Sequence, residues 1–211
     1  MIIKKQFFDL FIFFSILVGS CQFSSASETI ISNNCHEAVI TFLTHPTKRT
    51  LAALSVTKDN DCWNITVRTQ ENESFNKYFK KLIELVGNGN RWAAVYLIEH
   101  LKNLDGGDLE DSYIALGKFS DHEFEYLLLF VKNKQLHIDQ LTDALTMLPL
   151  SVSDNPQAQL TILYSRIKEA IRVTRKDLMK EKIHALKAMN DFKTEILSNM
   201  PVKKRCSKQA R

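Results

Sequence analysis

The sequence predicts an all-α fold in a single helical domain, and three observations support this. Apolar residues recur at helical spacing in successive blocks from residue 34 onward. The 211 residues include only 6 Gly and 4 Pro, so few positions interrupt a helix. The connections between blocks are short, which makes consecutive helices antiparallel neighbours. We expect about eight or nine helices, arranged either as an α-solenoid or as a compact bundle.

The first blocks form short helices. Residues 34–45 are expected to form a helix that begins at the capping residue Asn34 and ends before Pro46. A second helix is expected within residues 47–56. Apolar and polar residues then alternate, which predicts a short extended segment near residues 62–69.

The middle of the chain carries the strongest helical signal. Residues 74–86 place their apolar side chains on one face, and Gly87 is suited to the left-handed position that ends a helix. Asn90 is expected to cap a nearly all-apolar helix over residues 91–104. After an acidic turn and a further helix, Asp121 is expected to cap another helix of its own.

The last blocks are also helical. Residues 138–148 form an amphipathic helix that ends at Pro149. Asn155 precedes Pro156, which is the favoured order at a helix start. The apolar residues expected to face the core in the two final helices are Leu160, Leu163, Ile167, Ile171, Met179, Ile183, Leu186, Met189, Ile196 and Met200.

The paired amphipathic helices over residues 74–173 resemble HEAT-like α-solenoids. This resemblance implies stacked helix pairs that present an extended surface to a partner. The sequence contains no fixed period of repeated signature residues, and a compact bundle predicts the same pattern.

The N-terminus has the layout of a secretory signal peptide. Lys4 and Lys5 precede an apolar run, and the "VGSC" that follows resembles the lipobox of bacterial lipoproteins. The resemblance implies a signal peptide over residues 1–21, a lipid attached to Cys21, and a polar tether over residues 22–33. Cleavage after Ala26, which would release a soluble secreted protein, and a retained anchor are the alternatives.

The cysteines and the charges are unevenly placed. Export to an oxidising compartment favours a disulfide between Cys35 and Cys62, with buried thiols as the alternative, and leaves Cys206 without an assigned partner. Residues 22–165 contain 12 Lys/Arg and 18 Asp/Glu, a net charge of −6, whereas residues 166–211 contain 14 and 5, a net charge of +9. The helical domain is expected over residues 34–200, followed by a basic tail over 201–211.

The basic C-terminal part is the candidate binding surface. Its expected members are Arg166, Lys168, Arg172, Arg175, Lys176, Lys180, Lys203, Lys204 and Arg205. On an exported protein such a surface would meet an acidic protein or anionic lipid headgroups rather than nucleic acid. The alternative is an ordinary solvated, lysine-rich helix surface.

The motifs that carry catalysis are missing from the sequence. It contains no G-x-S-x-G, no HExxH and no phosphate-binding loop, so no catalytic residue, metal ligand or cofactor is assigned. We therefore expect a membrane-anchored, non-enzymatic helical protein that binds a protein partner in the bacterial periplasm. The layout resembles that of lipoprotein immunity proteins, which inhibit toxins. A small envelope-acting hydrolase using Cys35, His36 or the acidic turn, or a released secreted interaction protein, are the alternatives.

Overall fold

The computed structural model describes residues 26–57, 60–62 and 72–200, and these are mostly helical. The α-helices are α1 (Ala26–Thr44), α2 (Lys48–Leu54), α4 (Asn72–Gly87), α5 (Arg91–His100), α6 (Gly106–Lys132), α7 (Ile138–Thr146), α8 (Pro156–Arg172) and α9 (Met179–Asn199). Short 3₁₀ segments are η1 (Leu101–Asn103), η2 (Leu150–Val152) and η3 (Lys176–Leu178). Eight α-helices within these ranges confirm the predicted all-α class and helix number.

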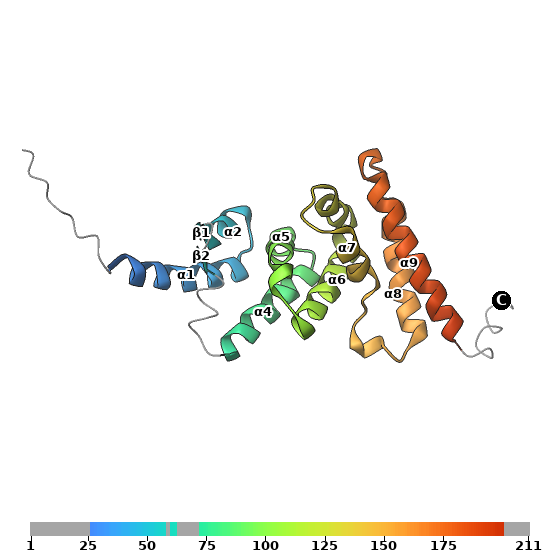
Figure 1. Cartoon of the computed structure of the whole chain (residues 1–211), viewed down its shortest axis with the longest axis horizontal. Coiled ribbons are helices and arrows are strands. Elements are labelled where there is room, and N and C mark those ends of the chain that lie inside the picture. The colour runs from blue at the N-terminus through green and yellow to red at the C-terminus, as the bar shows by residue number, and fades with distance from the viewer. Residues whose placement is uncertain (1–25, 58–59, 63–71, 201–211) are drawn as a thin grey trace, which may run out of the picture.

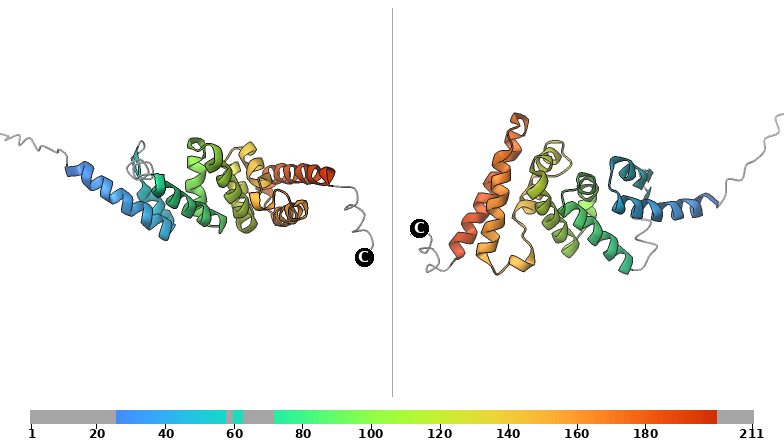
Figure 2. Two further views of the ribbon diagram at one scale, coloured as in Figure 1. Left: turned by 90° about the horizontal axis from the view of Figure 1, so that it is seen from below. Right: turned by 180° about the vertical axis from the view of Figure 1, so that it is seen from behind.

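The helices stack in chain order along the long axis of the molecule (Figure 1). α1 packs on α2 and α4, α4 on α5 and α6, α6 on α7 and α8, and α9 on α7 and α8. Contacts therefore join elements that are close in the sequence, as in helical-repeat folds. α8 and α9 lie side by side at the C-terminal end in every view (Figure 2).

Two short strands precede the segment that was predicted to be extended. Strand β1 (Ser55–Thr57) pairs antiparallel with β2 (Asn60–Asp61) directly after α2. The expected segment at residues 62–69 lies outside the described residues except for Cys62. The described strands form one small two-stranded ribbon and do not alter the helical class.

The prediction for the start of the first helix is wrong. α1 begins at Ala26, so Asn34 lies inside the helix rather than at its cap, and most of the segment expected as a tether is helical. Residues 26–33 contain no Gly or Pro, so no residue in them breaks the helix. Residues 1–25, with the predicted signal peptide and Cys21, lie outside the described part, as does the tail at 201–211.

The end of α4 is set by a different glycine from the one predicted. Gly87 is the last helical residue, and Gly89 has the positive φ of 83°. The amide of Gly89 donates to the carbonyl of Val86 at 2.9 Å, and the amide of Asn90 donates to the carbonyl of Leu85 at 3.0 Å. This pair of hydrogen bonds is a Schellman motif, which requires the left-handed residue two positions later than Gly87.

Two of the three predicted asparagine caps are confirmed. The side-chain oxygen of Asn90 accepts hydrogen bonds from the amides of Trp92 and Ala93, at 3.1 and 2.9 Å. Asn155 accepts from the amide of Ala158 at 3.1 Å, with Pro at the first position of α8. Both caps pair amides that the first helical turn leaves without an intrahelical acceptor.

α6 contains the two helices predicted here, joined across a kink two residues after the predicted cap Asp121. The kink is at Glu123, where φ is −135° and ψ is 45°. Asp121 was expected to cap the second helix, but its carboxylate instead lies 3.5 Å from the guanidinium Nε of Arg166 on α8. A long-range ionic contact thus takes the place of a local cap.

The core runs along the stack between neighbouring helices. Its largest fully buried apolar side chains are Phe42, Leu54, Leu82, Leu97, Leu116, Phe119, Leu127, Leu128, Leu136, Leu141 and Leu145. At the C-terminal end the predicted apolar stripe is only partly buried. Ile171, Met179 and Ile183 are 60%, 42% and 60% exposed, because no further helix of the described chain covers this end. These three are corrections to the predicted core, whereas Met189 and Ile196 are buried as expected.

Among the described helices, none combines the length and the hydropathy needed to cross a bilayer.

Candidate functional site: a basic groove between the α6–α7 turn and α9

The sulfur atoms of Cys35 and Cys62 lie at disulfide-bonding distance, 2.08 Å, as predicted. Both cysteines are buried, and the bridge ties α1 to the segment that follows the β1–β2 ribbon. A bridged sulfur carries no thiolate, so Cys35 in this state cannot act as a nucleophile. His36 packs its ring edge-on to Tyr78, with centroids 6.0 Å apart.

Arg166 does not belong to the basic surface, which corrects the prediction. Its side chain is 1% exposed. Nη1 donates to the backbone carbonyl of Leu145 at 2.9 Å and approaches that of Ala144 at 3.5 Å. These carbonyls belong to the last turn of α7, where the helix leaves acceptors unpaired and its dipole favours a cation. Arg166 therefore fastens α8 to the end of α7.

A glycine on α6 makes room for this arginine. A Cβ at Gly117 would lie 2.5 Å from Nη2 of Arg166 and closer still to the carbonyl oxygen of Ala144. Asp121 supplies the nearest carboxylate, but it is itself partly buried. Loss of solvation raises the pKa of Asp121 above its ordinary value, although the charge of Arg166 opposes this shift. Loss of solvation likewise lowers the pKa of Arg166.

Other cations of the predicted surface pair within the fold. Arg172 pairs with Glu169 one turn earlier on α8. Arg175 contacts Glu125 at 3.2 Å and Asp177 at 2.6 Å, and Lys132 also holds Asp177. Hydrogen bonds from Arg175 and Lys132 keep the pKa of Asp177 below its usual range. This network joins the end of α6 to the segment before α9.

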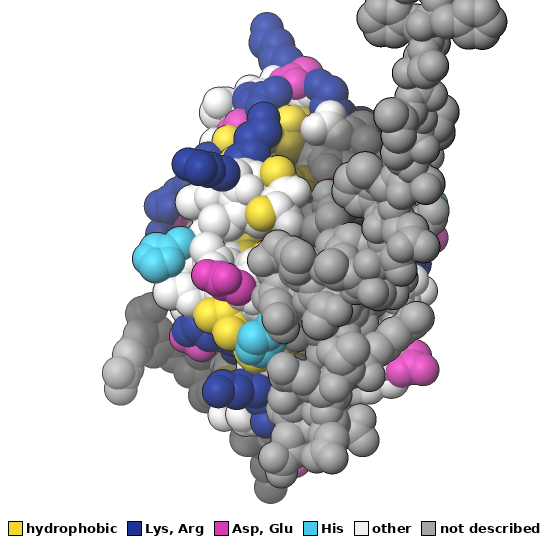
Figure 3. Space-filling view, turned by 90° about the vertical axis from the view of Figure 1, so that its left-hand side faces the viewer, with side chains coloured by type: hydrophobic (Ala, Val, Ile, Leu, Met, Phe, Trp, Pro, Cys, Tyr) yellow, Lys and Arg dark blue, Asp and Glu magenta, His cyan; other side chains and the backbone are white. Residues whose placement is uncertain are grey.

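The remaining predicted members differ in position. Lys168, Lys176 and Lys180 are exposed on α8, η3 and α9. Lys203, Lys204 and Arg205 lie outside the described residues, so their part in the surface stays a prediction. Lysine and arginine side chains gather at the upper end of the molecule in Figure 3, the height at which α8 connects to α9 in Figure 1.

One groove of about 930 Å³ combines Lys180, alone among the described members of the predicted surface, with other lysines and with apolar side chains. We call it the basic groove. One wall comes from the end of α6, the turn after it and the start of α7, and the other from the first half of α9. It is lined by Val131, Lys132, Lys134, Gln135, Leu136, His137, Ile138, Gln140, Lys180, Glu181, Ile183, His184 and Lys187.

The groove carries a net positive charge. Four lysines and one glutamate line it, and Lys132 is already held by Asp177. Within the described part of the chain, the ammonium groups of Lys134, Lys180 and Lys187 make no hydrogen bond or ion pair. His184 is anchored, because its Nε2 lies 3.1 Å from the hydroxyl of Thr142 on α7. The groove can therefore offer three unpaired cations around a fixed wall.

Lys134 adopts an unusual backbone conformation. Its φ is 60°, in the left-handed region that favours glycine. Lys134 ends α6 with the same pair of hydrogen bonds that Gly89 makes possible after α4. The amide of Lys134 donates to the carbonyl of Val131 at 2.9 Å, and the amide of Gln135 donates to the carbonyl of Phe130 at 2.9 Å. A lysine at this position costs about 1 kcal/mol relative to glycine, and its side chain lines the basic groove.

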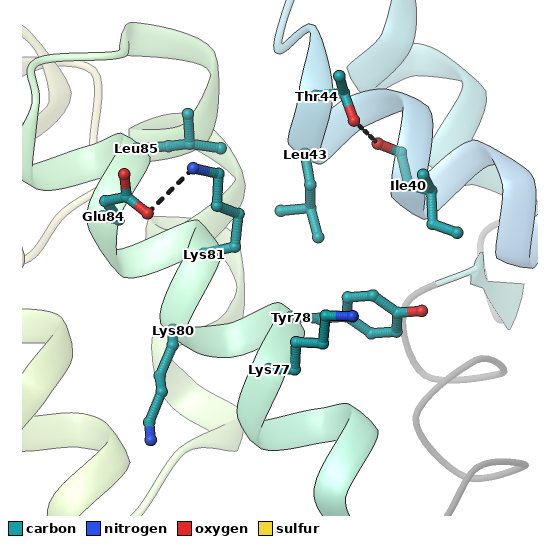
Figure 4. Close-up of a pocket in the computed structure, with 9 residues that line it drawn as sticks. All are labelled: Ile40, Leu43, Thr44, Lys77, Tyr78, Lys80, Lys81, Glu84 and Leu85. Carbon is teal, nitrogen blue, oxygen red and sulfur yellow. Dashed lines mark hydrogen bonds and ion pairs between the residues drawn. The ribbon is translucent and has the colours of Figure 1, made fainter.

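A second groove, of about 700 Å³, lies between α1 and α4. Figure 4 shows Leu43 and Ile40 of α1 across the gap from Leu85 of α4. Of its three lysines, Lys81 pairs with Glu84 at 3.0 Å, Lys80 points away from the gap and Lys77 lies beside Tyr78 (Figure 4). Its lining of three lysines and one glutamate carries less positive charge than that of the basic groove, which makes it the weaker candidate for charge recognition.

Sequence reasoning found Lys180 but did not assign Lys134 or Ile183 to the site. Lys134 belongs to residues 22–165, which are acidic overall, and Ile183 fits a helical apolar stripe. The detectable signal was the sequence Lys-Asn-Lys at residues 132–134, in which a lysine rather than glycine or asparagine follows the last residues of an apolar helix and the cap residue Asn133.

Comparisons with protein-family models, with curated proteins and with solved structures give no match to this chain.

Proposed function

We propose that the chain is an exported, lipid-anchored helical protein without enzymatic activity, which binds a protein partner on the periplasmic side of a bacterial membrane. The basic groove is the surface that would bind this partner. The observation that carries the proposal is the convergence of three unpaired lysines from two walls around the exposed Ile183. Charge around an apolar centre is the usual composition of a protein-binding site.

Two features support a binding role over the hydrolase alternative. Cys35 is engaged with Cys62, which removes the thiolate that this alternative would use. Among the described residues, no cluster of His, Cys, Asp and Glu has the geometry of a metal site. An inhibitor of a toxin, as in immunity proteins, is the specific form of this proposal.

Crosslinking in cells tests this proposal. The full chain would be crosslinked to its neighbours and purified, alongside the variant Lys180→Glu/Lys187→Glu and the control Lys48→Glu/Lys102→Glu. Both pairs reverse two exposed charges, but the control pair lies outside the basic groove. A partner recovered with the wild type and the control, but not with the groove variant, is the expected result. Recovery that is equal for all three contradicts the proposal.

Mass spectrometry of the mature N-terminus tests the anchor separately. A diacyl or triacyl modification on Cys21 supports the lipid-anchored form. An unmodified N-terminus at Ser27 supports the released, secreted form instead.

A further inference from the structure

We infer that the basic groove recognises a short acidic peptide segment in which an aliphatic side chain lies between two carboxylates. This inference rests on the proposed function, because it names the chemistry of the partner at the same groove. It follows from the order of side chains along α9, from the conformation of Lys134 and from the hollow shape of the site.

The side chains that α9 contributes to the groove form one stripe. Lys180, Ile183, His184 and Lys187 are spaced i, i+3, i+4 and i+7, so they share a helix face. Along this face the order is cation, apolar group, cation. With a rise of 1.5 Å per residue, the two lysines are about 10 Å apart along the axis. One small anion cannot contact both, whereas a ligand with two separated carboxylates can.

An extended peptide has a matching spacing. Its side chains alternate, so residues i, i+2 and i+4 point to one side and span about 13 Å. The difference from about 10 Å is well within the reach of flexible lysine side chains. A peptide with Glu at both ends and Leu in the middle would place its carboxylates at Lys180 and Lys187 and its aliphatic group on Ile183, which is 60% exposed.

Lys134 provides the third cation, from the opposite wall. Its strained backbone is not needed to end α6, since glycine would end the helix without strain. A strained residue at the mouth of a groove is typical of a site where the side chain has a separate role. The role that fits its position in the lining is contact with a carboxylate or a backbone carbonyl of the bound segment.

The hollow shape favours a peptide over a membrane surface. Leu136 lines the groove but is only 1% exposed, and the rest of the lining comes from two separate parts of the chain, the α6–α7 turn region and α9. A flat bilayer would contact the rim and leave the floor uncovered, whereas a narrow chain can enter. The vesicle arm of the test below examines the membrane alternative.

Fluorescence anisotropy with synthetic peptides tests the inference on the full chain. The probe is a labelled Glu–Ser–Leu–Ser–Glu peptide. One control replaces both Glu by Gln and the other replaces Leu by Ser. The wild type is expected to bind the probe more tightly than either control, and Lys180→Gln or Lys187→Gln is expected to weaken binding about fivefold each, as for a single exposed ion pair. Lys102→Gln, which is exposed outside the groove, is the matched control variant.

Lys134→Gly separates binding from folding. This variant is expected to bind the probe more weakly while its midpoint of urea unfolding rises, because the left-handed strain is relieved. A merely structural lysine would give the rise in stability without the loss of binding. The inference is overturned if the probe fails to bind, or if it binds no better than its two control peptides. It is also overturned if Lys180→Gln and Lys187→Gln abolish binding to phosphatidylglycerol vesicles but leave the probe unaffected.

The two proposals can fail independently. A groove-dependent partner in cells without binding of the probe leaves the proposed function standing and refutes the acidic-peptide inference. Probe binding without any groove-dependent partner in cells refutes the proposed function instead.

Discussion

Gly117 on α6 is the position at which the packing of three helices can be tested most directly. The substitution Gly117→Ala would place a methyl group 2.5 Å from Nη2 and 2.9 Å from Cζ of Arg166. It would lie even closer to the backbone oxygen of Ala144. A backbone oxygen cannot rotate away, so α7 must shift or Arg166 must leave its place.

Three contributions set the size of the effect. Alanine in a helix interior is favoured over glycine by about 1 kcal/mol. Overpacking a filled core costs about 1–3 kcal/mol. Displacing Arg166 from its carbonyl acceptors would leave a buried charge without partners, and losing one side of such a pairing costs about 3–5 kcal/mol. A partial displacement therefore gives a net loss of about 2–4 kcal/mol, or roughly 5–15 °C in Tm for a chain of this size.

Gly107→Ala is the matched control on the same helix. A Cβ there meets no atom within 4 Å, and the residue is exposed. We expect its stability to equal or slightly exceed that of the wild type. Both variants would be compared by urea unfolding followed by far-ultraviolet circular dichroism. If Gly117→Ala proves as stable as Gly107→Ala, then Arg166 does not occupy the space above Gly117 and the described packing is incorrect.

Three further predictions concern stability. Asp121→Asn should flatten the dependence of the unfolding free energy on pH. Because the pKa of Asp121 is raised in the folded protein, the folded state binds more protons, and the wild type should lose stability relative to the variant as pH rises above 3.8. A loss of wild-type stability on acidification through that window would contradict this. Replacing Cys35 and Cys62 by serine should lower the free energy of unfolding by about 3.5 kcal/mol in the chain-entropy model. The comparison is made by urea unfolding against the wild type under non-reducing conditions, and an unchanged unfolding midpoint would exclude the bridge. Asn90→Ala should cost about 1 kcal/mol in urea unfolding, because the amides of the first turn of α5 lose their acceptor, whereas Asn88→Ala should cost less if capping is the cause.

Local features of the fold were predictable because their causes are local. Helical spacing of apolar residues indicated the helices, and Asn90 and Asn155 cap them as their side-chain chemistry suggests. The pairing of Cys35 with Cys62 was predicted from the expected export to an oxidising compartment and from the position of both cysteines in the N-terminal part of the chain. The errors at this level were shifts of position, as where the left-handed glycine is Gly89 rather than Gly87.

The candidate site was only partly predictable, because charge in a sequence does not reveal which charges remain available. Arg172 and Arg175 add to the positive charge counted in the sequence, yet each forms an ion pair with a carboxylate in the fold. The ammonium group of Lys182 donates hydrogen bonds to the carbonyls of Ile171 and Val173 at the end of α8. These pairings depend on the approach of separate helices, which composition does not specify.

The sequence by itself determined the all-α class, the number of helices, the caps of α5 and α8 and the excess of positive charge toward the C-terminus. The tertiary structure alone decided that Arg166 is buried above Gly117 and that Lys134 meets Lys180 and Lys187 around one groove. The physical reason is the distance along the chain over which each interaction acts. Helix formation and capping depend on residues within about one turn, whereas the solvation and pairing of a charge depend on whichever distant helix packs against it.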